Sequence, residues 1–455
     1  MTAVLRGAAT NLSGVVVLLV LVDLGISQNS LLFSGAALVV ALGLLVLVAI
    51  GPERMGIGLL LIGFVMAPMN AIGLGGNVTI SDVFLVLGFG LLVPRMLSEG
   101  RTKLPPLYFV GSAILLTGGL VSSLLSANVT DSLIGFVKII AAAMVLVIVL
   151  NMLRPSGKVL DAFVWSYVLG QMISAVYSVV RGGAATAGGR AVGLTTQPNF
   201  YGLAGQTAYA LLIYLFYRVD PKHRWIVVGA MAVVGFSVLN SGSRASLLCC
   251  ALITLMWPLI ERNAITWYWI LSGAVVALVS ANTLLPLIGQ DTVLERFQGG
   301  GSAALSDVAR EGLLSQGFTL FFQHPIQGIG WAKDTILAFH NAYLEVAVGG
   351  GVLTLVGFVI VIGTLVRPLF DKGGPNRLAY AGLSYAAFGM IGPTLYDRIV
   401  WVALALILVT YTGNGEQAPE PGSLRDRADK AEAEESAAPP GSRTKIMTPR
   451  RSRSD

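Results

Sequence analysis

The feature that most constrains this chain is a series of long apolar segments, which recurs from Val15 to Val409 with short polar breaks between them. A helix needs roughly 17–25 apolar residues to cross about 30 Å of hydrocarbon, and most of these segments reach that length. Only 12% of the residues are charged, whereas a soluble domain carries about 25%. A bilayer must therefore be the solvent for most of the chain. We predict an all-α polytopic membrane protein with about 12–14 transmembrane helices and one large extracytoplasmic loop that contains short helices.

Neither end of the chain is predicted to carry chemistry. The first apolar segment, near Gly14–Leu24, lacks a small-residue cleavage pattern and is soon followed by another, so we interpret it as an uncleaved span. Residues 413–455 are rich in Pro, Glu, Ala, Ser and Arg without apolar periodicity. That composition predicts a disordered tail after a membrane domain of residues 1–412.

Lysine and arginine set the orientation, because they concentrate in short cytoplasmic loops near the ends of spans. With the N-terminus inside, the cytoplasmic side receives Arg6, Arg54, Arg95, Arg101, Lys103, Arg154, Lys158, Arg218, Lys222, Arg224, Arg262, Arg367, Lys372 and Arg377. Both termini are then cytoplasmic, and the tail is a cytoplasmic segment.

The basic residues left at the outer side are concentrated in the second half of the chain. They are Arg181, Arg190, Arg244, Arg296, Arg310, Lys333 and Arg398. The early outer loops around Gln28, Gly75 and Asn128 carry no Lys or Arg. Topology does not require positive charge outside, so an anionic ligand is a reasonable cause. The alternative is that each arginine is an ordinary surface residue with a carboxylate partner.

One outer break, residues 286–340, is far longer than the others, and long loops often carry function. Ser306 and Asp307 predict the start of a helix within it. Arg310 then heads an apolar stripe suited to lie on the membrane surface or on the bundle. The stripe consists of Leu314, Phe318 and Phe321. The sequence "HPIQGIGW", His324–Trp331, ends this helix with a proline and makes the turn with two glycines.

His340 stands at the outer end of the next span and has the best setting for proton transfer among the three histidines. Asn341 and Glu345 are four residues apart and share a helix face, so we expect them to orient the imidazole. An ionisable residue such as Glu345 just inside the membrane indicates function by default. Gly349–Gly351 then allow close packing or a kink. The alternative for His340 is a helix-capping or structural role.

Three other outer elements carry positive charge without a topological reason. Arg190 lies in a glycine-rich loop, and Pro198 with Asn199 opens the next helix, an arrangement that suits a phosphate or a sugar hydroxyl. Arg244 lies in the very short turn "NSGSRAS", from which its guanidinium can reach inward. Lys138 sits inside a span near its outer end, where it either snorkels outward or neutralises a bound anion.

Four stretches, taken in order, resemble the O-antigen ligase and O-antigen polymerase superfamily of bacterial membrane glycosyltransferases. They are "RAVGLTTQPNF", "SGSRAS", "DVAREGLLSQGFTLFFQHPIQGIGW" and "FHNAYLEVAVGGGVLT". The resemblance covers roughly Arg190 to Leu355 and implies a ligase-like core over 190–366. It also implies the cytoplasmic (inner) membrane of a bacterium, with the active site on the extracytoplasmic face.

The resemblance further implies a reaction. A glycan on a polyprenyl diphosphate is transferred to an acceptor hydroxyl of a glycan or lipid-linked glycan, without a metal or other cofactor and without nucleic acid. His340 matches the proposed catalytic histidine, and Arg190, Arg244 and Arg310 match arginines that hold the diphosphate. General chemistry supports the same roles independently of the resemblance. Arginine forms two hydrogen bonds with phosphate oxygens, and histidine is a base near neutral pH. No Asp-x-Asp pair lies in the outer loops to hold a divalent ion.

Two other classes of function remain open. A transporter or flippase of lipid-linked oligosaccharide or of a small solute would fit the number of spans, although no internal repeat relates the two halves. A binding or scaffold role in envelope assembly would fit as well. Within the enzyme hypothesis, the acceptor could be a lipid-core sugar, the growing end of the same polysaccharide, or a protein side chain.

Overall fold

The computed structural model describes residues 43, 45, 47–75, 78–99, 102–181, 190–262, 267, 273–275, 283, 296–297, 303–332, 339–371 and 376–411. The predicted span near Gly14–Leu24 and the predicted tail of residues 413–455 lie outside these ranges. The same holds for part of the predicted loop, residues 286–295, 298–302 and 333–338.

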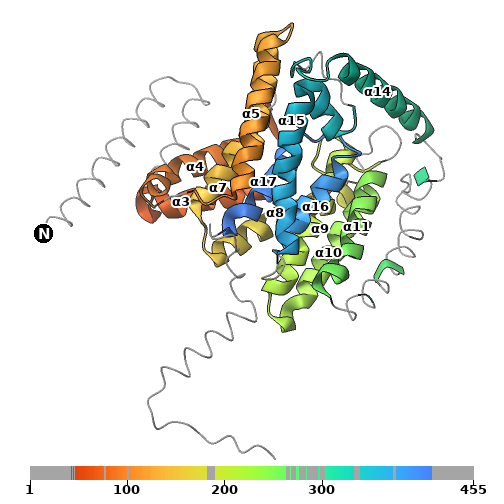
Figure 1. The fold of residues 1–455 in the computed structure, drawn as a ribbon. Helices are drawn as coiled ribbons and strands as arrows, with labels where there is room; N and C mark the ends of the chain where they lie inside the picture. Colours follow the sequence, from red (N-terminus) through yellow and green to blue (C-terminus); the bar gives the residue numbers. More distant parts are fainter. Residues whose placement is uncertain are drawn as a thin grey trace, which may run out of the picture.

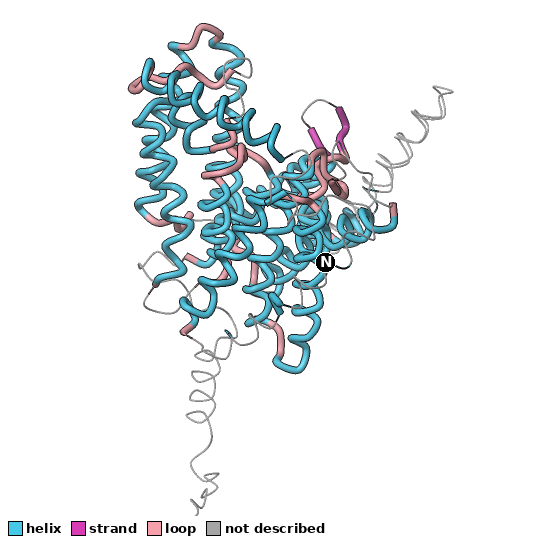
Figure 2. The backbone as a smooth tube through the Cα atoms, turned by 90° about the vertical axis from the view of Figure 1, so that its right-hand side faces the viewer, coloured by secondary structure: helices cyan, strands magenta, loops and turns pink. Residues whose placement is uncertain are grey.

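Helices make up nearly all of the described structure, which confirms the predicted all-α polytopic membrane fold (Figures 1 and 2). The principal helices are α3 (Pro52–Met66), α4 (Ile80–Glu99), α5 (Pro106–Leu125), α6 (Val129–Ile140), the π-helix η1 (Ala141–Val145), α7 (Leu146–Leu153), α8 (Gly157–Val180), α9 (Pro198–Arg218), η2 (Pro221–His223), α10 (Arg224–Asn240), α11 (Arg244–Glu261), α14 (Ala303–Gln323), α15 (Ala342–Val366), η4 (Arg367–Phe370), α16 (Ala379–Phe388), α17 (Arg398–Ile407) and η5 (Leu408–Thr410). A short hairpin of β1 (Gly73–Gly75) and β2 (Val78–Thr79) joins α3 to α4.

Seven helical stretches of the described chain are long and apolar enough to cross a membrane. They are α4 without its last residue, α5, α6 through α7, α8, η2 with α10, α11, and α15 with η4. The predicted total of about 12–14 spans includes segments outside the described residues and stays a prediction.

Helix α9 lies at the centre of the bundle and packs against α8, α10, α11, α16 and α17. Its side chains are buried almost without interruption from Tyr201 to Leu215. The helix is not among the seven stretches that are long and apolar enough to cross a membrane. Because protein rather than lipid surrounds it, it tolerates polar residues such as Gln206, which is fully buried. The first turn of α9 therefore stands in the middle of one end of the bundle.

Helix α15 is broken at Gly351, where the backbone takes φ 74° and ψ −179°. The backbone of the loop that follows α14 forms hydrogen bonds with the backbone of α15 around this break. The N–H groups of Ile329 and Gly330 donate to the carbonyls of Val348 and Gly349, each at 2.9 Å, and the Val352 N–H donates to the Pro325 carbonyl at 2.8 Å. Backbone groups released by the break thus keep hydrogen-bond partners, as an apolar environment requires. Of the two possibilities left open for Gly349–Gly351, close packing or a kink, the structure has a kink at Gly351.

We predict that Gly351→Ala destabilises the protein. A Cβ at this position would lie 1.9 Å from the Ile326 carbonyl oxygen, and only glycine readily adopts the backbone conformation found there. The strained backbone alone costs about 1–3 kcal/mol, and the overlap adds to it. Thermal unfolding of the detergent-solubilised protein measures the effect. The matched control is Gly363→Ala in the same helix, where a Cβ meets nothing within 4 Å; equal melting temperatures for the two variants would contradict the prediction.

Helix α14 begins at Ala303, one turn earlier than the predicted start at Ser306 and Asp307. Both residues lie inside the helix, and Asp307 pairs with an arginine rather than capping the helix. Of the predicted apolar stripe, Leu314 and Phe321 pack on the bundle, whereas Phe318 is 50% exposed. The buried face instead passes through Gly317, whose missing side chain leaves room for Phe339. The apolar residues that pack there against Phe339, Leu344 and Val348 are Leu313, Leu314, Leu320 and Phe321.

Candidate active site

The candidate site lies at the end of the bundle that carries α14, which we call the α14 end (Figure 1). Helices α9, α11 and α15 begin at this end, and α10 ends there. The turn between α10 and α11 is short because Gly242 takes a positive φ of 61°, and Ser243 then caps α11 by accepting a hydrogen bond from the Ser246 N–H. The sequence thus places Arg244 at the first position of α11, directly after a tight turn.

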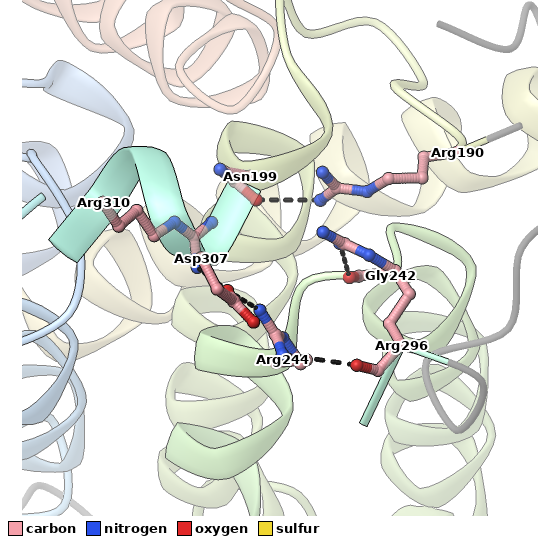
Figure 3. A network of polar contacts seen from close by, with 7 residues as sticks. All are labelled: Arg190, Asn199, Gly242, Arg244, Arg296, Asp307 and Arg310. Carbon is pink, nitrogen blue, oxygen red and sulfur yellow. Dashed lines mark hydrogen bonds and ion pairs between the residues drawn. The ribbon is translucent and has the colours of Figure 1, made fainter. Parts of the chain in front are cut away.

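Four arginines converge beside this turn, and we call Arg190, Arg244, Arg296 and Arg310 the arginine network (Figure 3). Arg190 is only 8% exposed. Its Nε donates to the Ser241 carbonyl at 3.0 Å, and its Nη2 donates to Asn199 Oδ1 at 2.8 Å. Asn199 in the first turn of α9 therefore holds a guanidinium in place, as a supporting residue would.

Asp307 of α14 joins the other arginines. It forms an ion pair with Arg244, and its Oδ1 lies 3.9 Å from Nη1 of Arg310. Hydrogen bonding from Arg244 holds the pKa of the Asp307 carboxyl below its ordinary value. Among the residues drawn in Figure 3, the carboxylate of Asp307 lies between the guanidinium groups of Arg244 and Arg310. The Nε of Arg310 is buried and has no hydrogen-bond partner in the described part of the chain.

Arg296 was noted in the sequence only as one outer basic residue, and its place in the network was missed. It is 2% exposed. Its Nη1 donates to the Gly242 carbonyl at 2.5 Å, and its own carbonyl accepts from Arg244 Nη1 at 3.3 Å. The only signal in the sequence was positive charge where topology does not require it. Nothing in the local pattern showed which side chain it would meet.

His340 directly precedes Asn341, the N-cap residue of α15, and takes the left-handed backbone conformation with φ 56°. The side chain is half-buried. Burial, and then the positive charge of Arg310, lower the pKa of the imidazole below its ordinary value. His340 therefore lies within electrostatic reach of the arginine network and is neutral at pH 7, with a nitrogen able to accept a proton.

Asn341 and Glu345 do not orient His340, contrary to the prediction. Asn341 Oδ1 accepts the Leu344 N–H at 3.0 Å and caps α15. Glu345 is 5% exposed and accepts a hydrogen bond from the Phe339 backbone. No hydrogen bond joins the imidazole to either residue in the described structure. The reason is geometric, because the helix starts after His340 and the histidine does not share its face.

Lys138, predicted to bind the same anion, is not brought into the arginine network. Its Nζ lies 5.8 Å from the centre of the Tyr396 ring, which immediately precedes Asp397 and α17. Helix α6 turns this residue toward α17 rather than toward α9 and α11. Within the described residues, no group of three or more His, Cys, Asp or Glu side chains is placed to hold a metal ion.

No protein-family model matches this chain, and no curated protein matches it significantly. A functional proposal therefore depends on the chemistry of the arginine network and His340.

Proposed function

We propose that this protein is a membrane glycosyltransferase similar to the O-antigen ligases and polymerases. It transfers a glycan from a polyprenyl diphosphate to an acceptor hydroxyl at the extracytoplasmic face of a bacterial cytoplasmic membrane. The observation that supports this function most is the meeting of four arginines from separate segments at the end of the bundle where His340 lies. The arginine network holds the diphosphate, and His340 is the catalytic base.

The reaction needs an anion-binding group, the arginine network, and a base, His340. It includes no redox step. The acceptor oxygen attacks the anomeric carbon, the bond from that carbon to the diphosphate oxygen breaks, and the lipid diphosphate leaves with the bonding electron pair. The acceptor proton passes to the neutral imidazole of His340. Guanidinium groups remain charged at any physiological pH and stabilise the negative charge that develops on the leaving diphosphate.

The position of the network fits a lipid-bound donor. Arg190 and Arg244 stand at or beside the first turns of α9 and α11, so a bound diphosphate lies at the ends of the helices while its polyprenyl chain stays in hydrocarbon. A soluble sugar nucleotide would not need a site at this level. The position of the positive charge therefore supports a lipid-linked donor.

One observation favours a second candidate, a transporter of lipid-linked oligosaccharide. Transporters often contain discontinuous helices, and α15 is broken at Gly351. In such proteins the binding site lies near the bilayer midplane at the break. Here the charged groups of the network lie at the α14 end instead, which is why we favour the enzyme.

Reconstitution separates the two candidates. The full chain in lipid vesicles is given a polyprenyl-diphosphate glycan and a saccharide acceptor, and both glycan transfer and translocation are measured. We expect transfer, and we expect His340→Ala to abolish it while His324→Ala, a histidine at the end of α14, leaves it intact. Translocation that survives His340→Ala, without any transfer by the wild type, would support the transporter.

The activity should depend on pH in a way set by His340 and Arg310. Because the base must be unprotonated, transfer falls as pH drops through the pKa of His340, which lies below its ordinary 6.5. Removing the positive charge in Arg310→Gln raises that pKa, so the loss of activity begins at a higher pH. Burial is the larger cause of the lowered pKa of His340. The pKa of His340 in Arg310→Gln should therefore rise, but it should stay below its ordinary value. Profiles of kcat/KM against pH that fall at the same pH in both proteins would contradict this assignment.

A further inference from the structure

A second group of polar side chains lies beside the first turn of α15, apart from the arginine network. We call Glu345 and Asp397 the carboxylate pair. Glu345 is 5% exposed, and its Oε1 has no hydrogen-bond partner in the described structure. A buried oxygen without a hydrogen-bond partner destabilises the protein. A ligand that donates a hydrogen bond would remove that cost.

Asp397 supplies a second carboxylate without a structural task. It occupies the N-cap position of α17, yet its side chain accepts no hydrogen bond from the helix. Aspartate at this position usually caps. Arg398 pairs with Asp82, and no ion pair to Asp397 is found among the described residues. The negative charge of the Asp397 carboxyl acts electrostatically on Glu345. Burial raises the pKa of Asp397 to about 6.

Tyr396 and Lys138 border the carboxylate pair. The Tyr396 side chain is 46% exposed, which leaves room for a ligand against its ring. The Lys138 Nζ lies 5.8 Å from the centre of that ring and forms no ion pair in the described part of the chain. An aromatic face, two hydrogen-bond acceptors and one ammonium donor therefore stand together.

The backbone keeps this group next to His340. The Phe339 backbone hydrogen-bonds to the Glu345 carboxylate, directly before the histidine. The Ala342 N–H donates to the Gly389 carbonyl at 2.7 Å, which ties the start of α15 to the connection that leads to Asp397. His340 is thus flanked by Arg310 of the network and, across the first turn of α15, by Glu345.

Building on the proposed function, we propose that Glu345, Asp397, Tyr396 and Lys138 form the subsite for a saccharide acceptor. Carboxylates accept hydrogen bonds from sugar hydroxyls, and a tyrosine ring packs against the apolar face of a pyranose. The guanidinium groups of the arginine network attract a diphosphate, whereas the subsite offers hydrogen-bonding groups and an aromatic ring to an uncharged sugar.

The test measures saccharide binding without donor and without turnover. The full chain in lipid nanodiscs is titrated with methyl α-glucoside, methyl α-galactoside and methyl N-acetyl-α-glucosaminide by saturation-transfer NMR, and separately with inorganic pyrophosphate by calorimetry. We expect at least one sugar to bind the wild type, and Asp397→Asn and Tyr396→Ala each to weaken it about tenfold, which corresponds to about 1.4 kcal/mol. Pyrophosphate affinity should be unchanged in both variants, which also shows that they are folded. The control is Asp131→Asn, which changes a carboxylate in the first turn of α6 that pairs with Asn128.

Unchanged sugar affinity in Asp397→Asn and Tyr396→Ala, or no binding of any of the three sugars to the wild type, would overturn the subsite. Sugar binding that depends on these residues in a protein that never transfers a glycan would overturn the proposed function alone. The two failures are therefore distinguishable.

Discussion

Replacing His340 by asparagine is expected to lower kcat/KM for glycan transfer by about 10²–10⁴-fold, the usual contribution of a general base. Asparagine is chosen because it tolerates the left-handed conformation that the residue adopts, with φ 56°. The variant therefore loses the base without added backbone strain. The rate of transfer and the binding of donor are measured on the same preparation, and donor affinity should remain close to that of the wild type.

His324→Asn is the matched control, because His324 lies just after α14 and, among the described residues, its ring hydrogen-bonds to Gln327 at 3.4 Å and not to the arginine network. It should transfer glycan at the wild-type rate. A His340→Asn variant with wild-type turnover would show that the acceptor proton goes elsewhere. His340 would then be a structural residue at the start of α15.

The second large effect is expected for Arg244. Arg244→Gln should lower the rate of transfer by about 10²–10³-fold, as removal of one preorganised donor from a developing negative charge does. The reason is that Arg244 links the turn after α10 to α14 through Asp307 and contributes charge to the network. Transfer is measured with saturating acceptor, so that the measured rate does not depend on the binding of the acceptor.

Asp307→Asn separates a structural role of Arg244 from a role in binding. If the ion pair with Asp307 were the only task of Arg244, both variants would lose activity equally. We predict instead that Asp307→Asn retains the network and binds the anionic donor at least as well, because a competing carboxylate has gone. Equal loss in Arg244→Gln and Asp307→Asn would contradict a direct role for Arg244.

The fold could be predicted from the sequence because a helix that crosses the hydrocarbon must reach a minimum length and be mostly apolar. Both properties can be read directly from the sequence. Segments such as Pro106–Leu125 have both. The three adjacent glycines at Gly349–Gly351 allowed either close packing or a kink, and only the structure shows the break at Gly351. The start of α14 was placed one turn late, because Ser306 and Asp307 resemble a cap but Asp307 pairs with Arg244 instead.

The site was only partly predictable. Arg190, Arg244 and Arg310 could be predicted as site residues because membrane topology does not require basic residues at the outer side. The structure brings the three side chains together. Arg296 joins them from a segment without periodicity, so no spacing revealed its partner. The roles given to Glu345 and Lys138 failed for another reason. Sequence spacing gives the face of a helix on which a residue lies, but the neighbour that this face meets depends on tertiary packing.

The affinity of the full chain for a short polyprenyl diphosphate tests the central claim most directly. Farnesyl diphosphate is titrated into the wild type, Arg244→Gln and Arg224→Gln in lipid nanodiscs. Arg224 is the control because it begins α10 at the end of the helix opposite the arginine network. We predict at least about tenfold weaker binding to Arg244→Gln, or about 1.4 kcal/mol, and wild-type binding to Arg224→Gln. Equal affinity in all three proteins would contradict a diphosphate site at the arginine network.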